Sequence, residues 1–193
     1  MTRRPEGLTK LMIKGILAGF VFGVVVITAT VYLYFATGRA PVAVTAPEMP
    51  FERKLAHMAI HAYLEKLPHP DSPVPADESN LREGAIVYAK YCAVCHGLPG
   101  ANRTVIADGM APRPPQLLKS TGGTDDEPWE NYWIVENGVR MTGMPGFKNH
   151  LTETQIWQVS LLIKNAGKIT PTVRQILSDG PEAETKQDRF SPH

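Results

Sequence analysis

This sequence contains few cysteines and has almost no net charge. Its 193 residues include only Cys92 and Cys95 as cysteines, and the formal net charge is +1. Two cysteines cannot build the disulfide framework of a small secreted domain. Residues 1–40 carry a net charge of +4, and the rest of the chain carries −3. Phosphate binding needs clustered Lys and Arg side chains, so this weakly acidic remainder argues against a nucleic-acid partner.

The alternating apolar and polar pattern of β-strands is also missing between residues 77 and 167. That region contains three helical patterns instead, each with a recognisable beginning or end. They run from a cap at Asp77 or Ser79 to Tyr91, from Pro128 to Val135 before Asn137-Gly138, and from the capping box Thr152–Gln155 to Gly167. These patterns predict a small, mainly α-helical domain.

Charged residues are absent from Gly15–Ala36, a run of 22 residues. As a helix it would span about 33 Å, against about 30 Å of bilayer hydrocarbon. Tyr32 and Tyr34 lie near one end, where interfacial aromatic side chains anchor membrane spans. The alternatives are a buried core helix and a cleaved secretory signal, whose apolar core is about 7–15 residues long. The length of the run and its apolar character on every face favour a transmembrane anchor.

The charges that flank this run predict its orientation. Basic residues gather in residues 1–14, whereas only Arg39 follows the run closely. The positive-inside rule therefore predicts a single-pass protein of the bacterial inner membrane, with a cytoplasmic N-terminus and the later residues on the periplasmic side. The basic residues before the run are Arg3, Arg4, Lys10 and Lys14.

Prolines divide the rest of the chain into segments. Residues 37–78 form a Pro-rich stalk, in which apolar residues at helical spacing predict a short amphipathic helix over residues 51–67. Residues 79–168 are expected to form the folded domain, and residues 169–193 are expected to form a polar C-terminal tail.

The motif that carries chemistry is Cys92-Ala-Val-Cys95-His96. C-x-x-C-H is the attachment sequence for a c-type haem. One turn of chain presents both thiols to the two vinyl groups on one edge of the porphyrin, and His96 then points its imidazole at the iron. The motif thus predicts one covalently attached haem c, held by Cys92 and Cys95 with His96 as an iron ligand.

Three other interpretations of the motif compete with haem attachment. A zinc site usually needs a second cysteine pair, which the sequence lacks. A thioredoxin-like redox pair requires a strand-to-helix setting, whereas the neighbourhood here is helical. A chance match conflicts with the position of the motif at the end of a predicted helix, on the translocated side of the membrane span.

The second iron ligand is predicted to be Met144. It lies in Thr142-Gly-Met-Pro-Gly-Phe147, where glycine permits close backbone approach and proline sets the direction of the chain. His/Met ligation raises the reduction potential, as suits an electron carrier. The rival ligands are Met110, Met141, His57, His61 and His150. Met110 follows His96 by only fourteen residues, and Met141 lacks a following proline.

Together these residues resemble the class I cytochromes c, in particular the bacterial membrane-anchored mono-haem type. The resemblance covers roughly residues 80–166. It is carried by Gly84-x-x-x-Tyr88-x-x-x-Cys92-x-x-Cys95-His96-Gly97, Met110-Ala-Pro-Arg-Pro-Pro-Gln-Leu117, Tyr132-Trp133-x-x-x-Asn137-Gly138, Met144-Pro145-x-Phe147 and Leu151-Thr-x-x-Gln155-Ile156-Trp157.

The resemblance implies a domain of three to five helices wrapped round one haem. It implies that the first and last helices cross at Gly84, with Trp157 or a neighbour packing close by. It also implies that a backbone carbonyl in Ala111–Pro115 accepts a hydrogen bond from His96 Nδ1. Trp133 and Trp157 are either walls of the haem pocket or ordinary core residues.

Three functions compete. The first is a tethered carrier, not itself an enzyme, that passes single electrons between respiratory or photosynthetic protein partners and takes no small-molecule substrate. The second is a permanent haem subunit of a larger membrane oxidoreductase, such as a quinol-oxidising complex, terminal oxidase, dehydrogenase or reaction centre. The third, a haem sensor or peroxidase, needs an open sixth iron position, which Met144 would close.

Overall fold

The computed structural model describes residues 6–118 and 125–180, which divide into a unit before Phe51 and a unit from Phe51 onward. The first unit contains helix α1 (Glu6–Ala36). Residues 9–36 of α1 are long and apolar enough to cross a membrane, and none of the span is buried within the protein. This agrees with the apolar helix predicted for Gly15–Ala36, although the observed helix begins earlier, at Glu6. Arg3 and Arg4, used above for orientation, lie outside the described residues.

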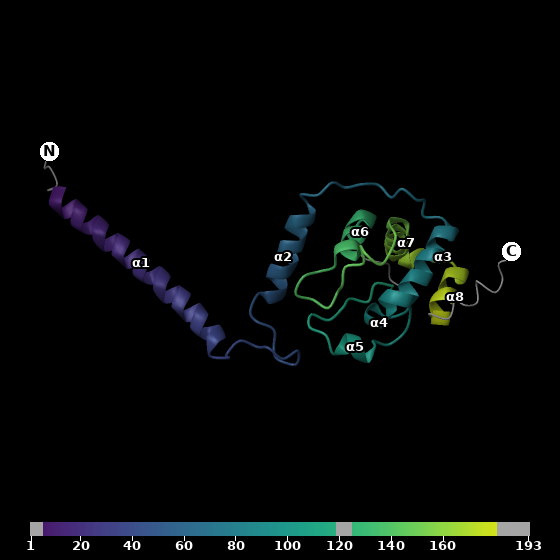
Figure 1. The fold of residues 1–193 in the computed structure, drawn as a ribbon, viewed down its shortest axis with the longest axis horizontal. Coiled ribbons are helices and arrows are strands. Elements are labelled where there is room, and N and C mark those ends of the chain that lie inside the picture. The colour runs from purple at the N-terminus through teal and green to yellow at the C-terminus, as the bar shows by residue number, and fades with distance from the viewer. Residues whose placement is uncertain (1–5, 119–124, 181–193) are drawn as a thin grey trace. The chain divides into compact units, whose positions relative to one another are not determined.

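The second unit is helical, and no strand occurs in the part of the chain that the structure describes. This confirms the predicted mainly α fold class. Figure 1 shows its helices gathered around one another. They are α2 (Glu52–Leu64), α3 (Glu78–Val87), the π-helical turn η1 (Tyr88–Cys92), α4 (Ala93–His96), α5 (Val105–Asp108), α6 (Pro128–Asn137), α7 (Glu153–Lys164), the 3₁₀ turn η2 (Ala166–Lys168) and α8 (Pro171–Asp179).

Side-chain caps set the helix starts. Asp77 Oδ1 accepts a hydrogen bond from the Asn80 backbone N–H at 2.9 Å, so of the two predicted caps the structure uses Asp77. Thr152 and Gln155 form a reciprocal capping box at the start of α7. These bonds satisfy N–H groups that have no partner within the helix.

The core lies where α7 packs against α3 and α6. Gly84 of α3 meets the backbone of α7 so closely that a Cβ atom there would overlap the Gln158 carbonyl oxygen. The close approach buries almost the whole of α7 from Ile156 to Ile163. The crossing expected at Gly84 is therefore present, and the neighbour that touches it is Gln158.

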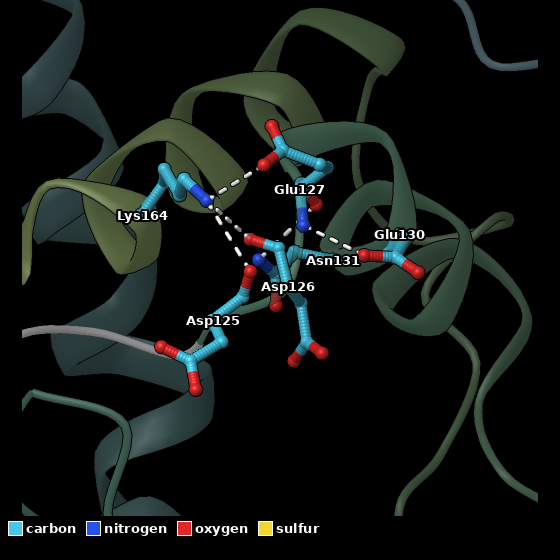
Figure 2. Close-up of polar contacts among 6 residues, drawn as sticks. All are labelled: Asp125, Asp126, Glu127, Glu130, Asn131 and Lys164. Atoms are coloured by element: carbon cyan, nitrogen blue, oxygen red, sulfur yellow. Dashed lines mark hydrogen bonds and ion pairs between the residues drawn. The ribbon is translucent and has the colours of Figure 1, made fainter. Parts of the chain in front are cut away.

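Lys164 joins the end of α7 to the start of α6 (Figure 2). Its ammonium group donates to the backbone carbonyls of Asp125 and Asp126, at 3.4 and 3.1 Å, and to Glu127 Oε1 at 3.0 Å. Glu127 and Glu130 form the capping box of α6. This lysine thus fixes the position of α6, which leads directly into the Met144 loop.

The folded part extends beyond the boundary that the sequence suggested at Lys168. Thr170 caps α8, and Pro171 occupies its first turn. Val173 and Leu177 of α8 are fully buried, and α8 packs against α3. The signal was present as an N-cap followed by apolar residues at helical spacing, but the polar residues around it resembled a tail. Residues 181–193 lie outside the described part.

Candidate functional site

Helix α3 and the turn η1 place the Cys92–His96 motif at the edge of the core. The α-helical hydrogen-bond pattern of α3 widens into the π-helical turn η1 at Tyr88–Cys92, and α4 then carries Cys95 and His96. One-turn π insertions are frequent at functional sites because they re-aim the following side chains. Both cysteines are free thiols, with Cys92 buried and Cys95 half-buried.

A backbone carbonyl orients the His96 ring. His96 Nδ1 lies 2.8 Å from the Pro115 carbonyl oxygen. A carbonyl can only accept, so Nδ1 carries the proton and the Nε2 lone pair is left for a metal. Burial lowers the pKa of His96, and the hydrogen bond to Pro115 partly opposes that shift, so the imidazole is held neutral. Among the carbonyls from Ala111 to Pro115, the structure selects Pro115.

Two further bonds support the surroundings of His96. Arg103 donates from Nη1 to the Pro114 carbonyl oxygen at 2.8 Å. Thr104 donates from Oγ1 to the Val94 carbonyl oxygen at 2.6 Å, which ties the start of α5 to the motif itself. Sequence reasoning missed both residues, because neither bond joins neighbours in the chain.

The environment of Cys92 is unsuited to thiol–disulfide exchange. Burial, together with the nearby Cys95, raises the pKa of the Cys92 thiol to about 12. Redox-active Cys-x-x-Cys pairs have an accessible thiol with a lowered pKa. Among the described residues, no group of three His, Cys, Asp or Glu side chains could hold a metal ion. The redox-pair and zinc alternatives therefore find no support in the geometry.

The Met144 loop is held against the end of α6 by backbone bonds. Val139 N–H donates to the Met144 carbonyl oxygen at 3.2 Å, and Phe147 N–H donates to the Val135 carbonyl oxygen at 2.9 Å. Thr142 Oγ1 accepts from the Met144 N–H at 3.1 Å and donates to the Val139 carbonyl oxygen. The Met144 side chain is half-buried and packs against the core. These bonds fix the backbone of the loop at Met144.

Two glycines allow that loop to approach α6. A Cβ atom on Gly138 would lie 2.6 Å from the Gly146 nitrogen, and a Cβ atom on Gly146 would lie 2.7 Å from the Asn137 carbonyl oxygen. Gly138 also has a positive φ of 70°, which favours glycine. The sequence suggested Gly138 as a helix stop. The need for glycine at position 146 follows from the fold.

The rival ligands lie in different settings. Met141 is 93% exposed and has a positive φ of 61°. His57 and His61 are exposed on α2, with ring centroids 6.2 Å apart. Met110 is half-buried, and its methyl group covers Gly143, next to Met144. Met110 thus reaches the Met144 loop. Its short spacing from His96 had made such a reach unexpected.

Comparison with known families agrees with this arrangement. The family model described as "Cytochrome C oxidase, cbb3-type, subunit III" matches residues 79–163. That range contains the thiols, the histidine and the Met144 loop. Residues 79–163 form a class I cytochrome c domain. This domain is therefore a haem-binding domain of the electron-transfer cytochromes.

Two curated relatives share similarity with about half of the chain. Quinohemoprotein alcohol dehydrogenase ADH-IIG of Pseudomonas putida is 30% identical over 107 residues. Quinohemoprotein alcohol dehydrogenase ADH IIB of the same organism is 26% identical over 102 residues. Each match covers 53% of this chain but only 13% of the relative. The similarity thus concerns a small part of each relative.

The donor groups fit the haem c that a cytochrome c domain implies. The structure offers two free thiols one helical turn apart, a neutral imidazole with an available Nε2, and a thioether on a clamped loop. Imidazole and thioether are the ligand pair of cytochromes c. Trp157 is buried and stacks on Tyr132 with ring centroids 4.3 Å apart, and Trp133 contacts Tyr63. Both tryptophans thus take part in aromatic packing within the domain.

Tyr88 gives a first testable prediction about the cytochrome c domain. Its buried hydroxyl donates to the Gly97 carbonyl oxygen at 2.9 Å, and burial raises the pKa of the phenol far above its usual value, so it stays a donor. Tyr88→Phe is expected to reduce the free energy of unfolding by about 1–2 kcal/mol, because the carbonyl loses its partner. Denaturant titration followed by circular dichroism measures this.

The matched control is Tyr91→Phe. Tyr91 is partly exposed, with its ring against Phe147. Removing its hydroxyl is expected to change the free energy of unfolding by no more than about 0.5 kcal/mol. Equal losses in the two variants would show that the Tyr88 bond has no special weight.

Proposed function

We propose that this chain is a membrane-tethered mono-haem cytochrome c that carries single electrons between respiratory or photosynthetic partners on the periplasmic side. The observation that carries the proposal is that both donor groups are held within the matched domain: the Pro115 carbonyl orients His96, and Met144 lies on a loop bonded to the end of α6. A haem iron bound there would cycle between ferric and ferrous states by one electron.

The residues have separate roles in this proposal. Cys92 and Cys95 hold the haem through thioether bonds, His96 and Met144 ligate the iron, and the Pro115 carbonyl keeps the imidazole in one orientation. Because both ligands are fixed by backbone bonds, the site changes little in shape when its charge changes. Such a site favours rapid electron transfer and leaves no iron position open to peroxide or gas.

The tether is the second part of the proposal. Helix α1 has the length and composition of a membrane span, and Lys10 and Lys14 lie toward its N-terminal side. An anchor of this kind confines the cytochrome to the membrane surface and raises its effective concentration near membrane partners. By the positive-inside rule, the haem domain lies in the periplasm.

Covalent attachment is tested by acid extraction. Protein made in a host with c-type haem maturation is denatured and treated with acidified organic solvent. We expect the pigment to stay with the polypeptide, and a haem stain to follow the 21.2 kDa band on a denaturing gel. The Cys92→Ala variant is the control and should bind haem weakly or not at all. Pigment extracted from the wild-type chain would overturn the proposal.

A permanent subunit of a larger oxidoreductase is the second candidate function. It is favoured by the family description, which names an oxidase subunit, and by the relatives, in which the matching region is 13% of a dehydrogenase. Mild detergent extraction of native membranes separates the two. Co-migration of the haem with large subunits supports a subunit role, and a separate small species supports a carrier.

A further inference from the structure

Helix α2 has apolar side chains on two opposite sides. With helical spacing, positions 56, 60, 63 and 64 fall on one side, and positions 55, 58 and 62 fall on the other, which the N-cap residue Phe51 precedes. A helix that only covers the surface of a domain needs one apolar side. The second side of α2 therefore requires its own explanation.

The first side is attached to the cytochrome c domain. Leu64 is almost completely buried, with 2% of its surface exposed. Tyr63 contacts Trp133 of α6, with ring centroids 5.2 Å apart. Just after the helix, His69 stacks on Trp129 at 4.1 Å with an angle of 13° between the rings. These contacts make α2 a part of the second unit and fix which way its other side faces.

The other side carries a row of large apolar side chains, Phe51, Leu55 and Met58, which we call the α2 stripe. Their exposed fractions are 73%, 55% and 58%, so the described part of the chain leaves more than half of each side chain uncovered; on the first side, Leu64 is buried and Tyr63 is 53% exposed. Within α2, Lys54 is exposed on one flank of the stripe, and Glu65 and Lys66 follow the end of the helix, both exposed. Exposed apolar residues with lysine beside them are typical of helices that lie in a membrane interface, because a lysine stem reaches back to the headgroups.

The chain itself brings the α2 stripe to a membrane. Only residues 37–50 separate the end of α1 at Ala36 from Phe51. At about 3.3 Å per residue this linker reaches at most about 46 Å, so α2 stays near the surface that α1 enters. At such an effective concentration even a short, weakly binding helix stays on the bilayer.

We propose that the α2 stripe binds the periplasmic surface of the lipid bilayer, and that α2 thereby sets the orientation of the cytochrome c domain on the membrane. The inference rests on the proposed tether. One side of α2 inserts among lipid headgroups and upper acyl chains, and the other side packs against α6. Since α6 leads into the Met144 loop, the same contact determines which edge of the haem site a membrane partner meets.

The test uses the full-length haem-loaded protein in lipid nanodiscs. Met58→Cys is labelled with an environment-sensitive dye, and Gln175→Cys, on an exposed position of α8, is labelled as the control. We expect blue-shifted emission and quenching by nitroxide-labelled lipids at position 58, and water-like, unquenched emission at position 175. Equal emission at the two positions would overturn the proposal.

A second variant pair tests the stripe itself. Leu55→Ser in the protein labelled at position 58 should remove most of the quenching. Val105→Ser is the matched control: Val105 is 90% exposed on α5, and its replacement should leave the quenching unchanged. The failures are distinguishable. Protein that does not co-elute with nanodiscs refutes the tether, whereas protein that co-elutes with an unquenched dye at position 58 refutes only the docking of α2.

Discussion

Replacing Met144 by alanine is expected to abolish the weak near-infrared band of the ferric protein and to lower its reduction potential by on the order of a few tenths of a volt. A thioether ligand stabilises ferrous iron relative to ferric iron, and water or an empty position does so less. The loop should survive the change, because the bonds to Val139, Thr142 and Phe147 that hold it do not involve the Met144 side chain. Absorption spectroscopy and redox titration measure the two effects.

Two methionines near Met144 provide the controls. Met141→Ala should leave the band and the potential nearly unchanged, because that side chain is almost wholly exposed. Met110→Ala should keep the band, since Met110 covers Gly143 while Met144 remains available as ligand. If the band survives in Met144→Ala and vanishes in one of these controls, the ligand is that other methionine.

Replacing Gly84 by alanine is expected to cost about 3 kcal/mol of folding free energy, the largest stability effect predicted here. The new methyl group would overlap the Gln158 carbonyl oxygen, and a backbone group cannot rotate away as a side chain can. The helices α3 and α7 would have to separate, which exposes the core around Val159 and Leu162. A lower denaturant midpoint with an unchanged slope is the measurement.

Gly109→Ala is the matched control. Gly109 has a φ of −84°, which any residue adopts, and a Cβ atom there would meet its nearest neighbour, the Val105 carbonyl oxygen, at an ordinary 3.4 Å. The midpoint should hardly move. If Gly84→Ala is tolerated as well as Gly109→Ala, then α3 and α7 do not approach as closely as the structure shows.

The helices could be predicted where their signals are local. Asp77, the capping box of Thr152 and Gln155, and the stop at Gly138 act over three or four residues, so the sequence displays them directly. Helix α8 was missed because its evidence is burial: Val173 and Leu177 reveal their role only against α3. Polar residues between them concealed a short apolar face.

The haem site divides in the same way. The predicted attachment at Cys92, Cys95 and His96 follows from a contiguous motif whose spacing is set by the chemistry of attachment, and the proposal of Met144 as ligand follows from the loop that carries it. Which carbonyl accepts the hydrogen bond from His96 Nδ1 depended on Pro115 being brought alongside from 19 residues away. The support from Arg103 and the position of Met110 over Gly143 likewise depend on chain segments meeting in space.

By itself, the sequence determined the mainly helical fold class, the apolar span and the haem-binding type of the domain, because each depends on composition or on spacing within one stretch of chain. Only the tertiary structure decided which side of α2 contacts the rest of the domain. Periodicity shows that α2 has apolar positions on opposite sides, but it cannot show which of them the domain covers. The contacts of Tyr63 and His69 with α6 and its first turn settle that question and leave Phe51, Leu55 and Met58 exposed.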